Sequence, residues 1–319
     1  MRESEIKKMK KYCFGIDVGG TTVKCGLFTT DGEVLDKWEI KTRTENNGEN
    51  VLPDIAATIK AKIEEKGIAD EVEGIGLGIP GPVDDKGVLH GAVNLHWYED
   101  MKLEEEFSKM TGYPVKAGND ANVAALGELW KGAGVGYDSL ILLTLGTGVG
   151  GGIVINGKVV AGSNGAGGEV GHAHVADEIT DKCNCGCSGC LEQVASATGI
   201  ARLAREELAA SDEPSLLRDY ASVSAKSVFD CVKQNDAVAI RIAERFADYL
   251  AKAISIFAVV SDPQAIVIGG GVSKAGPILL DYIREPYQKY AFRSCRDVDF
   301  VLATLGNDAG IFGAAKLVL

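Results

Sequence analysis

A strand–turn–strand–turn–strand unit occurs twice along this chain, and it constrains the fold more than any other feature. The first copy reads as strand, glycine turn, strand, hairpin turn and strand at residues 11–17, 18–22, 23–30, 31–32 and 33–40. The second copy repeats this order at residues 139–145, 146–151, 152–155, 156–157 and 158–162. The second turns are Asp-Gly and Asn-Gly, which are hairpin signals. Internal similarity of this kind predicts an α/β fold with two like-folded halves that face each other.

Amphipathic patterns predict helices in the spaces between the strands. Helices are expected at residues 53–67, 119–132, 235–262 and 307–319. Residues 263–273 read as a buried strand that runs into a glycine turn. No low-complexity linker is present, so the domain boundaries must be tight crossings. We predict a flexible extension, a smaller N-terminal lobe and a larger lobe that carries the cysteine loop, at residues 1–10, 11–118 plus 306–319, and 119–305.

The charge balance and the first residues argue against several functional classes. The chain has 45 acidic and 33 basic residues and a formal net charge of −12, which disfavours a general basic face for nucleic acid. No apolar run reaches the ~18 residues of a membrane span. The sequence begins MRESEIKKMKKY, which is charged and lacks the apolar stretch of a signal peptide. We therefore expect a cytoplasmic protein with neither membrane nor nucleic acid among its partners.

Half of the eight cysteines lie in one short loop, at Cys183, Cys185, Cys187 and Cys190. Thiols stay reduced in the cytoplasm, so this cluster is not a disulfide framework, and metal or redox chemistry remains. Four packed free thiols without a ligand are improbable in a hydrophilic, glycine-rich loop. The cluster therefore predicts a metal site.

Two familiar phosphate motifs nearly match the second glycine turn. Gly146, Gly148 and Gly151 spell G-x-G-x-x-G after a strand, but a hairpin follows where a dinucleotide site needs a helix. The segment ending at Lys158 resembles a P-loop, but Val159 stands where Ser or Thr would bind Mg²⁺. Tight turns between strands explain both matches, and the first observation argues against a nucleotide-dependent dehydrogenase.

The 40 glycines are concentrated in five stretches, DVGGTT, GIGLGIPGP, LGTGVGGG, GSNGAGGEVG and IGGGVS. Glycine lets backbone N–H groups approach a ligand, so these stretches predict a phosphate-rich ligand or several tight turns. A turn between antiparallel strands can form a concave nest of N–H groups that binds anions. The turns in DVGGTT and LGTGVGGG, one from each half, could thus clamp a triphosphate, and Asp17 could hold Mg²⁺ through water.

Seven motifs in order carry a resemblance to a known family: DVGGTTVKCGL, GIPGPVD, GNDANVAALGE, LTLGTGVGGGIV, GGEVGH, CNCGCSGCLE and IVIGGGVS. Together they resemble the ROK family of sugar kinases and sugar-responsive repressors, over essentially everything after Lys11. The resemblance implies a two-lobed, actin-like (ribonuclease-H-like) ATPase fold with duplicated mixed-sheet domains, which agrees with the repeated hairpin unit.

Within that family the chain is most similar to kinases that act on glucose. The resemblance implies a transferase of carbohydrate metabolism and glycolysis that phosphorylates the 6-hydroxyl of glucose with ATP and Mg²⁺. Its lobes would close over the sugar, and it would form a homodimer or homotetramer. N-acetylmannosamine, mannose, fructose or allose is an alternative substrate. A non-catalytic sugar-sensing regulator is a further alternative, but the first strand begins near Tyr12 and leaves no room for a helix-turn-helix segment.

The resemblance also assigns roles to single residues. Asp120 would be the general base that takes the proton of the 6-hydroxyl, although capping of a helix explains its position equally well. A helix N-terminus keeps the carboxylate ionised, and phosphoryl transfer asks little basicity of it. The sugar-binding residues implied are Asn94, Asn119, Asp120, Glu169, His172 and Glu192. The residues implied for ATP and Mg²⁺ are Asp17, Gly19, Gly20, Thr21, Thr22, Lys24, Gly146, Thr147 and Gly148, with Gly269, Gly270 and Gly271 as the adenosine-side turn.

The cysteine loop matches the family pattern C-x-C-G-x-x-G-C-x-E. In the family's kinases the ligands of a structural Zn²⁺ correspond to His172, Cys183, Cys185 and Cys190, a closed tetrahedral set. Reasoning from the residues alone leaves Cys187 open as a ligand, and also His174 in place of His172. We interpret the zinc as a scaffold that fixes Glu192 and its neighbours in the sugar site.

Overall fold

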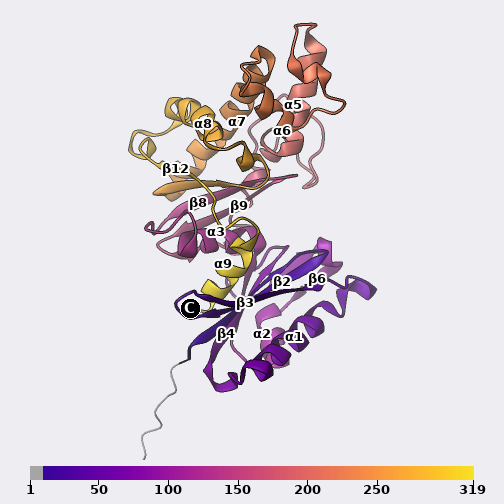
Figure 1. Cartoon of the computed structure of the whole chain (residues 1–319), viewed down its shortest axis with the longest axis vertical. Coiled ribbons are helices and arrows are strands. Elements are labelled where there is room, and N and C mark those ends of the chain that lie inside the picture. Colours follow the sequence, from indigo (N-terminus) through magenta and orange to yellow (C-terminus); the bar gives the residue numbers. More distant parts are fainter. Residues whose placement is uncertain (1–9) are drawn as a thin grey trace, which may run out of the picture. The chain divides into compact units, whose positions relative to one another are not determined.

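Each copy of the repeated unit forms the antiparallel part of a five-stranded mixed sheet in the computed structural model, which describes residues 10–319 (Figure 1). The first sheet has the order β3-β2-β1-β4-β7 and the second β10-β9-β8-β11-β12. β4 and β7 extend the first sheet in parallel, as β11 and β12 extend the second. The two sheets thus share one topology, which confirms the predicted duplication.

The chain divides into two compact units. The first comprises the residues up to Val135, Val159–Gly167 and Asn307–Leu319; the second comprises Gly136–Lys158 and Gly168–Gly306. Strands and helices of the first are β1 Tyr12–Val18, β2 Thr22–Thr29, β3 Val34–Lys41, α1 Val51–Lys66, β4 Val72–Ile79, β5 Leu89–Ala92, β6 Trp97–Met101, α2 Leu103–Thr111, β7 Val115–Asn119, α3 Asp120–Lys131 and α9 Ala309–Leu317. Those of the second, with β10 ending at the boundary, are β8 Leu140–Leu145, β9 Val149–Ile155, β10 Lys158–Val159, α4 Glu192–Ala195, α5 Ala197–Ala210, α6 Ala225–Val232, α7 Ala237–Ser261, β11 Ala265–Gly269, α8 Pro277–Tyr290 and β12 Asp299–Leu302.

The domain bounds taken from the sequence start the larger lobe at residue 119, whereas α3 lies in the first unit here because it packs along α9. Those bounds stay a prediction of how the chain divides. The predicted extension at residues 1–10 lies, apart from Lys10, outside the described residues. Within residues 10–319, no helix is long and apolar enough to cross a bilayer.

Alternation along β1 and β4 directs two helical layers onto opposite faces of the first sheet. Phe14 and Ile16 face the core that α1 and α2 cover, and Cys13 packs with α9 on the other face. On β4, the positions of Gly74, Gly76 and Gly78 face α9 and α3, because a Cβ on any of them would meet these helices or the residue that follows α9. The stretch GIGLGI is therefore a strand, and its glycines serve helix packing where the sequence predicted a ligand loop or a turn.

α9 packs so closely against this sheet that the glycines at the contact have no room for a side chain. A Cβ on Gly76 would lie 1.7 Å from the carbonyl oxygen of Ala314, and one on Gly15 would lie 1.9 Å from that of Ile311. On α9 itself, a Cβ on Gly313 would lie 1.7 Å from the carbonyl oxygen of Val123. Because these positions are glycine, the backbone of α9 can pack directly against the backbones of the sheet and of α3.

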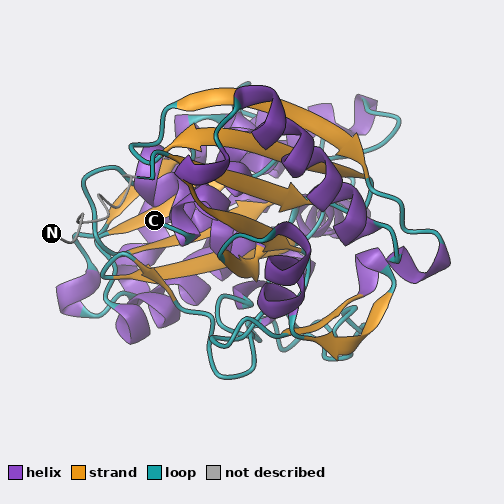
Figure 2. Ribbon diagram, turned by 90° about the horizontal axis from the view of Figure 1, so that it is seen from below, coloured by secondary structure: helices purple, strands orange, loops and turns teal. Residues whose placement is uncertain are grey.

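Helices flank the strands of both sheets (Figure 2). In the second unit, α7 spans 25 residues and contributes many of the core residues. The sequence predicts an apolar stripe on this helix from Val238 to Phe257. The stripe lies in the core as far as Ile254, and Phe257 is partly buried against it. Asp236 caps its N-terminus by accepting from the N–H of Ala239 at 2.9 Å. The four predicted helices are present. α1 begins two residues before Pro53, and α9 is two residues shorter at each end than the predicted range.

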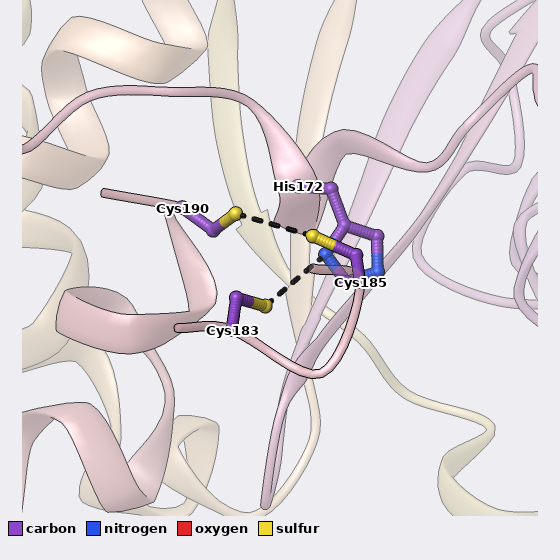
Figure 3. A group of neighbouring side chains, drawn as sticks. All are labelled: His172, Cys183, Cys185 and Cys190. Carbon is purple, nitrogen blue, oxygen red and sulfur yellow. Dashed lines mark hydrogen bonds between the residues drawn. The ribbon is translucent and has the colours of Figure 1, made fainter. Parts of the chain in front are cut away.

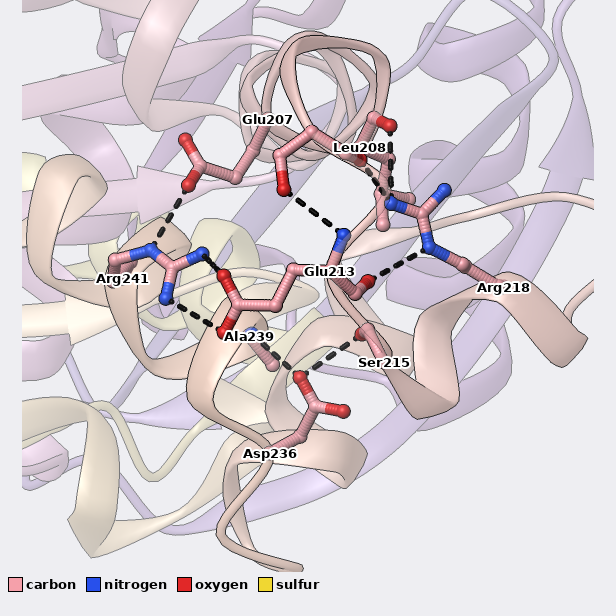
Figure 4. Close-up of polar contacts among 9 residues, drawn as sticks. Glu207, Leu208, Glu213, Ser215, Arg218, Asp236, Ala239 and Arg241 are labelled. Atoms are coloured by element: carbon pink, nitrogen blue, oxygen red, sulfur yellow. Dashed lines mark hydrogen bonds and ion pairs between the residues drawn. The ribbon is translucent and has the colours of Figure 1, made fainter.

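The connection from α5 to α6 is tied down by a polar network (Figure 4). Arg241 of α7 donates to the carboxylates of Glu207 and Glu213 at 3.0 and 2.7 Å. Asp236 accepts from the hydroxyl of Ser215 at 3.0 Å. The network therefore holds the connection against the ends of α5 and α7.

Candidate functional site

The candidate site residues divide between the two units. Those of the first unit are Asp17, Gly19, Gly20, Thr21, Thr22, Lys24, Asn94, Asn119 and Asp120. Those of the second are Gly146, Thr147, Gly148, Glu169, His172, Cys183, Cys185, Cys190, Glu192, Gly269, Gly270 and Gly271.

Asp17 lies on β1, where strand alternation turns it toward α9. A Cβ on Gly310 would lie 2.5 Å from its carboxyl carbon, so a larger residue there would displace the Asp17 carboxylate. Burial raises the pKa of Asp17 to about 6, Lys24 opposes this rise, and the charge of Asp120 adds to it. The carboxylates of Asp17 and Asp120 thus repel each other, and a divalent cation bound beside them would relieve this repulsion. The Lys24 ammonium donates to the carbonyl oxygen of Asn307 at 3.0 Å.

The end of β7 and the start of α3 position Asn119 and Asp120. The Asn119 side chain caps the helix, accepting from the N–H groups of Ala121 and Asn122 at 3.0 and 3.2 Å. Its amide donates to the carbonyl oxygen of Gly81 at 3.3 Å. One Asp120 oxygen accepts from the N–H of Ala121 at 2.8 Å. The capping alternative for Asp120 is therefore partly true, since its carboxylate contacts the first turn while Asn119 is the N-cap.

A cavity of about 330 Å³ lies in the first unit beside these residues. It contains the predicted sugar residue Asn94, and its lining residues are Pro80, Gly81, Pro82, His90, Gly91, Val93, Asn94, Trp97 and Tyr98. Gly81 lines the cavity, and its carbonyl oxygen accepts the hydrogen bond from the Asn119 amide. A Cβ on Gly20 would lie 3.2 Å from the carbonyl oxygen of Asn94, so the first glycine turn also borders Asn94.

The first glycine turn is a tight connection between β1 and β2. The Gly19 N–H donates to the carbonyl oxygen of Thr22 at 3.0 Å, and the Thr42 hydroxyl donates to that of Gly19 at 2.6 Å. Gly20 and Thr21 are exposed. The turn therefore has a fixed backbone and an accessible tip, as an anion-binding nest requires.

The second glycine turn, between β8 and β9, is held by the start of α5. The Gly146 N–H donates to the carbonyl oxygen of Gly148 at 3.0 Å. The Ala197 N–H donates to the Gly146 carbonyl and the Thr198 hydroxyl to the Thr147 carbonyl, both at 2.8 Å. The exposed Thr147 at its tip borders a large cavity of the same unit.

That cavity measures about 520 Å³, which is within the range for small-molecule sites. Of the predicted residues it contains Thr147 and Gly271, from the second glycine turn and the adenosine-side turn. Its complete lining is Thr147, Ala197, Thr198, Ala201, Val223, Ser224, Ala225, Lys226, Phe229, Asp230, Lys233, Gly271, Val272, Lys274 and Ala275. Most of these residues were missed by the sequence analysis, because the starts of α5 and α6 carry ordinary apolar patterns.

The adenosine-side turn follows β11. Gly270 has a φ of 82°, and a Cβ there would lie 2.6 Å from the backbone nitrogen of Leu145. Gly271 has open space where a Cβ would stand. The turn thus packs closely on the end of β8 and presents its last glycine to the 520 Å³ cavity.

Four side chains converge where the sequence predicts a metal (Figure 3). The ligand atoms of His172, Cys183, Cys185 and Cys190 all lie within 4.8 Å of one another. Cys183 Sγ is 3.7 Å from His172 Nδ1, and Cys185 Sγ is 3.6 Å from Cys190 Sγ. Three sulfurs and one imidazole nitrogen at this spacing fit a tetrahedral Zn²⁺.

The two alternative ligands are placed elsewhere. His174 uses both ring nitrogens on other partners, the carbonyl oxygen of Ser188 at 2.8 Å and the carboxylate of Asp177 at 2.7 Å. Cys187 is exposed and does not belong to the converging group. The geometry therefore favours His172 with three cysteines over the other two sets.

The thiols of the cluster differ in acidity. The Cys187 N–H donates to the Cys185 sulfur and lowers the pKa of that thiol to about 7. Burial, and then a hydrogen bond to Glu192, raise the pKa of the Cys183 thiol to about 12. A bound metal would deprotonate both, because the thiolate is the ligand form.

Glu192 lies between this cluster and the second glycine turn. One carboxylate oxygen accepts from the Cys183 thiol at 2.9 Å, and the other lies 2.6 Å from where a Cβ on Gly148 would stand. His172 Nδ1 is 3.9 Å from Glu192, and Nε2 is 4.0 Å from the carboxylate of Glu169. With Nδ1 on the metal, Nε2–H would be left as a donor on the same side as Glu169.

Comparison with known proteins places this chain among sugar kinases. The sequence profile of the ROK family matches residues 13–319. The glucokinase of Halalkalibacterium halodurans is 46% identical over 315 residues, or 97% of this chain and 95% of that protein. The ROK hexokinase from Thermus thermophilus has a TM-score of 0.79 at 32% identity, over 96% of this chain and 97% of that one. The ROK family glucokinase from Streptomyces griseus, solved with glucose and AMPPNP, has a TM-score of 0.71 at 34% identity, over 96% and 98%.

Proposed function

This chain belongs to the ROK family, and on that premise we propose that it transfers the terminal phosphoryl group of ATP to the 6-hydroxyl of glucose. The products are glucose 6-phosphate and ADP. The observation that supports this most is the position of Glu192, whose carboxylate borders both the second glycine turn and the metal cluster. Glu192, which we assign to the sugar, therefore lies next to the glycine turn that we assign to the phosphates.

We assign the proton transfer to Asp120. Its position at the start of α3 favours negative charge, and the cap by Asn119 fixes the helix end that carries it. Phosphoryl transfer proceeds mainly by positioning and charge neutralisation, so Asp120 needs correct placement more than strong basicity. Mg²⁺, which Asp17 would hold through water, supplies neutralisation of the phosphate charge when bound.

We assign hydrogen bonds to the sugar hydroxyls to Glu169, His172 and Glu192 in the second unit, and to Asn94 and Asn119 in the first. Their side chains are half-buried or exposed, so a ligand can reach them. Buried polar groups that lose a partner cost about 1–3 kcal/mol each, so such a set discriminates against sugars that lack one hydroxyl.

We propose that Zn²⁺ in the cluster scaffolds this arrangement. Cys183 now donates its thiol hydrogen to Glu192, and that hydrogen is lost when the thiol becomes a metal ligand. Glu192 is then available to accept from a sugar hydroxyl, while the cluster keeps its backbone fixed.

Replacing Cys190 by serine should remove zinc and raise KM for glucose by about 10- to 100-fold before the fold is lost. Cys190 is fully buried in the cluster, and Glu192 follows it by two residues. Zinc content by atomic absorption and KM for glucose would be measured together. Cys187→Ser is the matched control, because Cys187 is exposed in the same loop. A zinc-free protein with an unchanged KM would refute the scaffold.

The 520 Å³ cavity is our proposed adenosine site. Ala201→Phe would fill it from α5 and should raise KM for ATP about 10- to 100-fold, since base burial is lost, while KM for glucose stays unchanged. Ala210→Phe places the same side chain at the exposed end of the same helix and should change neither constant. Equal KM values for ATP in both variants would place the nucleotide elsewhere.

The proposed function is tested by ADP release with Mg-ATP against glucose, mannose, fructose, N-acetylglucosamine and N-acetylmannosamine. Glucose is expected to give the highest kcat/KM. Turnover with an N-acetylated sugar alone would keep the mechanism and replace the substrate. Sugar binding without any turnover would indicate a sugar-sensing regulator. A cytoplasmic location and a homodimer or homotetramer are also part of the proposal. None of the eight cysteines forms a disulfide, which is in keeping with a reducing compartment.

A further inference from the structure

His90 forms an ion-pair bridge at the wall of the 330 Å³ cavity, and none of the roles assigned above uses it. Its Nδ1 is 3.1 Å from the Asp100 carboxylate, and its Nε2 is 3.4 Å from the Asp84 carboxylate. A neutral imidazole carries one N–H and can donate to only one of them. The arrangement therefore suits the imidazolium, which donates to both.

The bridge connects segments that backbone hydrogen bonds and buried side chains such as Val83, Leu89 and Trp97 also hold in the core of the first unit. Asp84 closes the turn before β5, accepting from the N–H groups of Lys86 and Val88 at 3.0 and 2.9 Å. Asp100 lies on β6, directly opposite His90 in the antiparallel β5–β6 pair. The backbone N–H of His90 donates to the carbonyl oxygen of Pro82 at 2.8 Å. One side chain thus fastens the turn, β5 and β6 together.

These segments carry the residues assigned to the sugar. Asn94 lies in the turn between β5 and β6, and Gly81, which accepts from the Asn119 amide, adjoins Pro82. Asn94, Gly81 and His90 all line the same cavity. A shift of β5 relative to the turn before it would therefore move the walls that hold Asn94 and Gly81.

We propose that His90 is a positioning residue for sugar binding. Held between Asp84 and Asp100, its charged ring fixes the cavity wall and thereby sets the affinity for glucose. The inference rests on the proposed function for the identity of the sugar. It predicts that KM for glucose depends on the protonation of His90.

The direction of the pH effect follows from the partners of His90. Among the described residues, Asp100 and Asp84 are the charged groups that act on it, and their hydrogen bonds and charges raise its pKa above the usual 6.5. The stabilisation is therefore complete below pH 6.5 and is lost as the pH rises through the raised pKa. KM for glucose should be low below pH 6.5 and rise as the pH passes through the raised pKa of His90.

The test measures KM and kcat for glucose from pH 6 to pH 9 in His90→Gln and in the wild type. We expect His90→Gln to raise KM about three- to tenfold at pH 6, to leave kcat unchanged, and to remove the rise of KM with pH. Asp100→Asn, at a side chain that is 70% exposed, should give a smaller increase and couple to His90→Gln in a double-mutant cycle. Lys109→Gln, which removes an exposed ion pair with Glu105 on α2, is the control and should keep the wild-type profile.

Histidine ring NMR gives a second readout that does not need turnover. If the charged ring favours glucose binding, glucose must raise the pKa of His90 by reciprocity, and the resonance is assigned by its absence in His90→Gln. A glucose-independent titration, or a His90→Gln enzyme with wild-type KM at every pH, would overturn the proposal. A wild type that does not phosphorylate glucose would instead refute the proposed function, so the two failures are distinguishable.

Discussion

Asp120→Asn should lower kcat for glucose by about a hundred- to ten-thousandfold, with the fold and the binding of both substrates retained. Asparagine keeps the shape of the side chain but cannot take a proton at neutral pH. Its oxygen can still accept from the Ala121 N–H, which now lies 2.8 Å from the carboxylate. The measurement is ADP release at saturating glucose and Mg-ATP, with glucose binding followed by calorimetry.

Asp54→Asn is the matched control for this variant. Asp54 also lies in the first turn of a helix, α1, where its carboxylate pairs with the Arg43 guanidinium at 2.5 Å. Losing this surface pair should cost at most about 1 kcal/mol of stability and leave kcat unchanged. An Asp120→Asn enzyme within a few-fold of wild-type kcat would assign the proton acceptor to another group.

Gly76→Ala should destabilise the first unit by about 3 kcal/mol or more, whereas Gly78→Ala on the same strand should not. A Cβ on Gly76 would lie 1.7 Å from the Ala314 carbonyl oxygen, and neither backbone can yield without moving α9. At Gly78 the nearest atom would be a Val123 methyl at 3.5 Å, an ordinary contact. The second variant should gain about 0.4–1 kcal/mol, because alanine restricts the unfolded chain.

Tryptophan fluorescence in urea suits this pair of variants. All three tryptophans, Trp38, Trp97 and Trp130, lie in the first unit, so the signal reports on that unit alone. The midpoint should fall for Gly76→Ala and hold or rise for Gly78→Ala. Similar midpoints for both variants would mean that α9 can move away from the sheet at little cost.

The fold followed from sequence features that act locally. Asn156 and Gly157 adopt φ angles of 50° and 74°, the conformation for which Asn-Gly is selected in hairpins. Gly67 ends α1 at a φ of 64°, as a glycine after a helical pattern predicts. Such signals depend on single residues and their immediate neighbours, so they can be recognised without knowledge of the tertiary structure.

The candidate site was predictable only in part. The cysteine loop and its histidine were found because metal ligands are rare residue types at short spacing. The walls of the 520 Å³ cavity were not, since Ala197, Ala201 and Phe229 have the helical periodicity of core residues. An apolar side chain that faces a cavity and one that faces a neighbouring helix look the same in one sequence.

The glycines of β4 show a second limit. The stretch GIGLGIPGP could mean a ligand loop, tight turns or close packing, because glycine serves each purpose by the same absence of a Cβ. Only the carbonyl oxygen of Ala314, 238 residues further along the chain, identifies the purpose of Gly76. No local pattern could reveal that contact.

The dependence of the first unit on α9 sets an order for folding during synthesis. Ala309–Leu317 packs on β1, β4 and α3, yet it is synthesised long after these three elements. All the segments of the second unit, ending at Gly306, are made before this helix. We therefore expect the first unit to mature after the second. A nascent chain stalled just after Gly306 should hold a folded second unit and an incomplete first one.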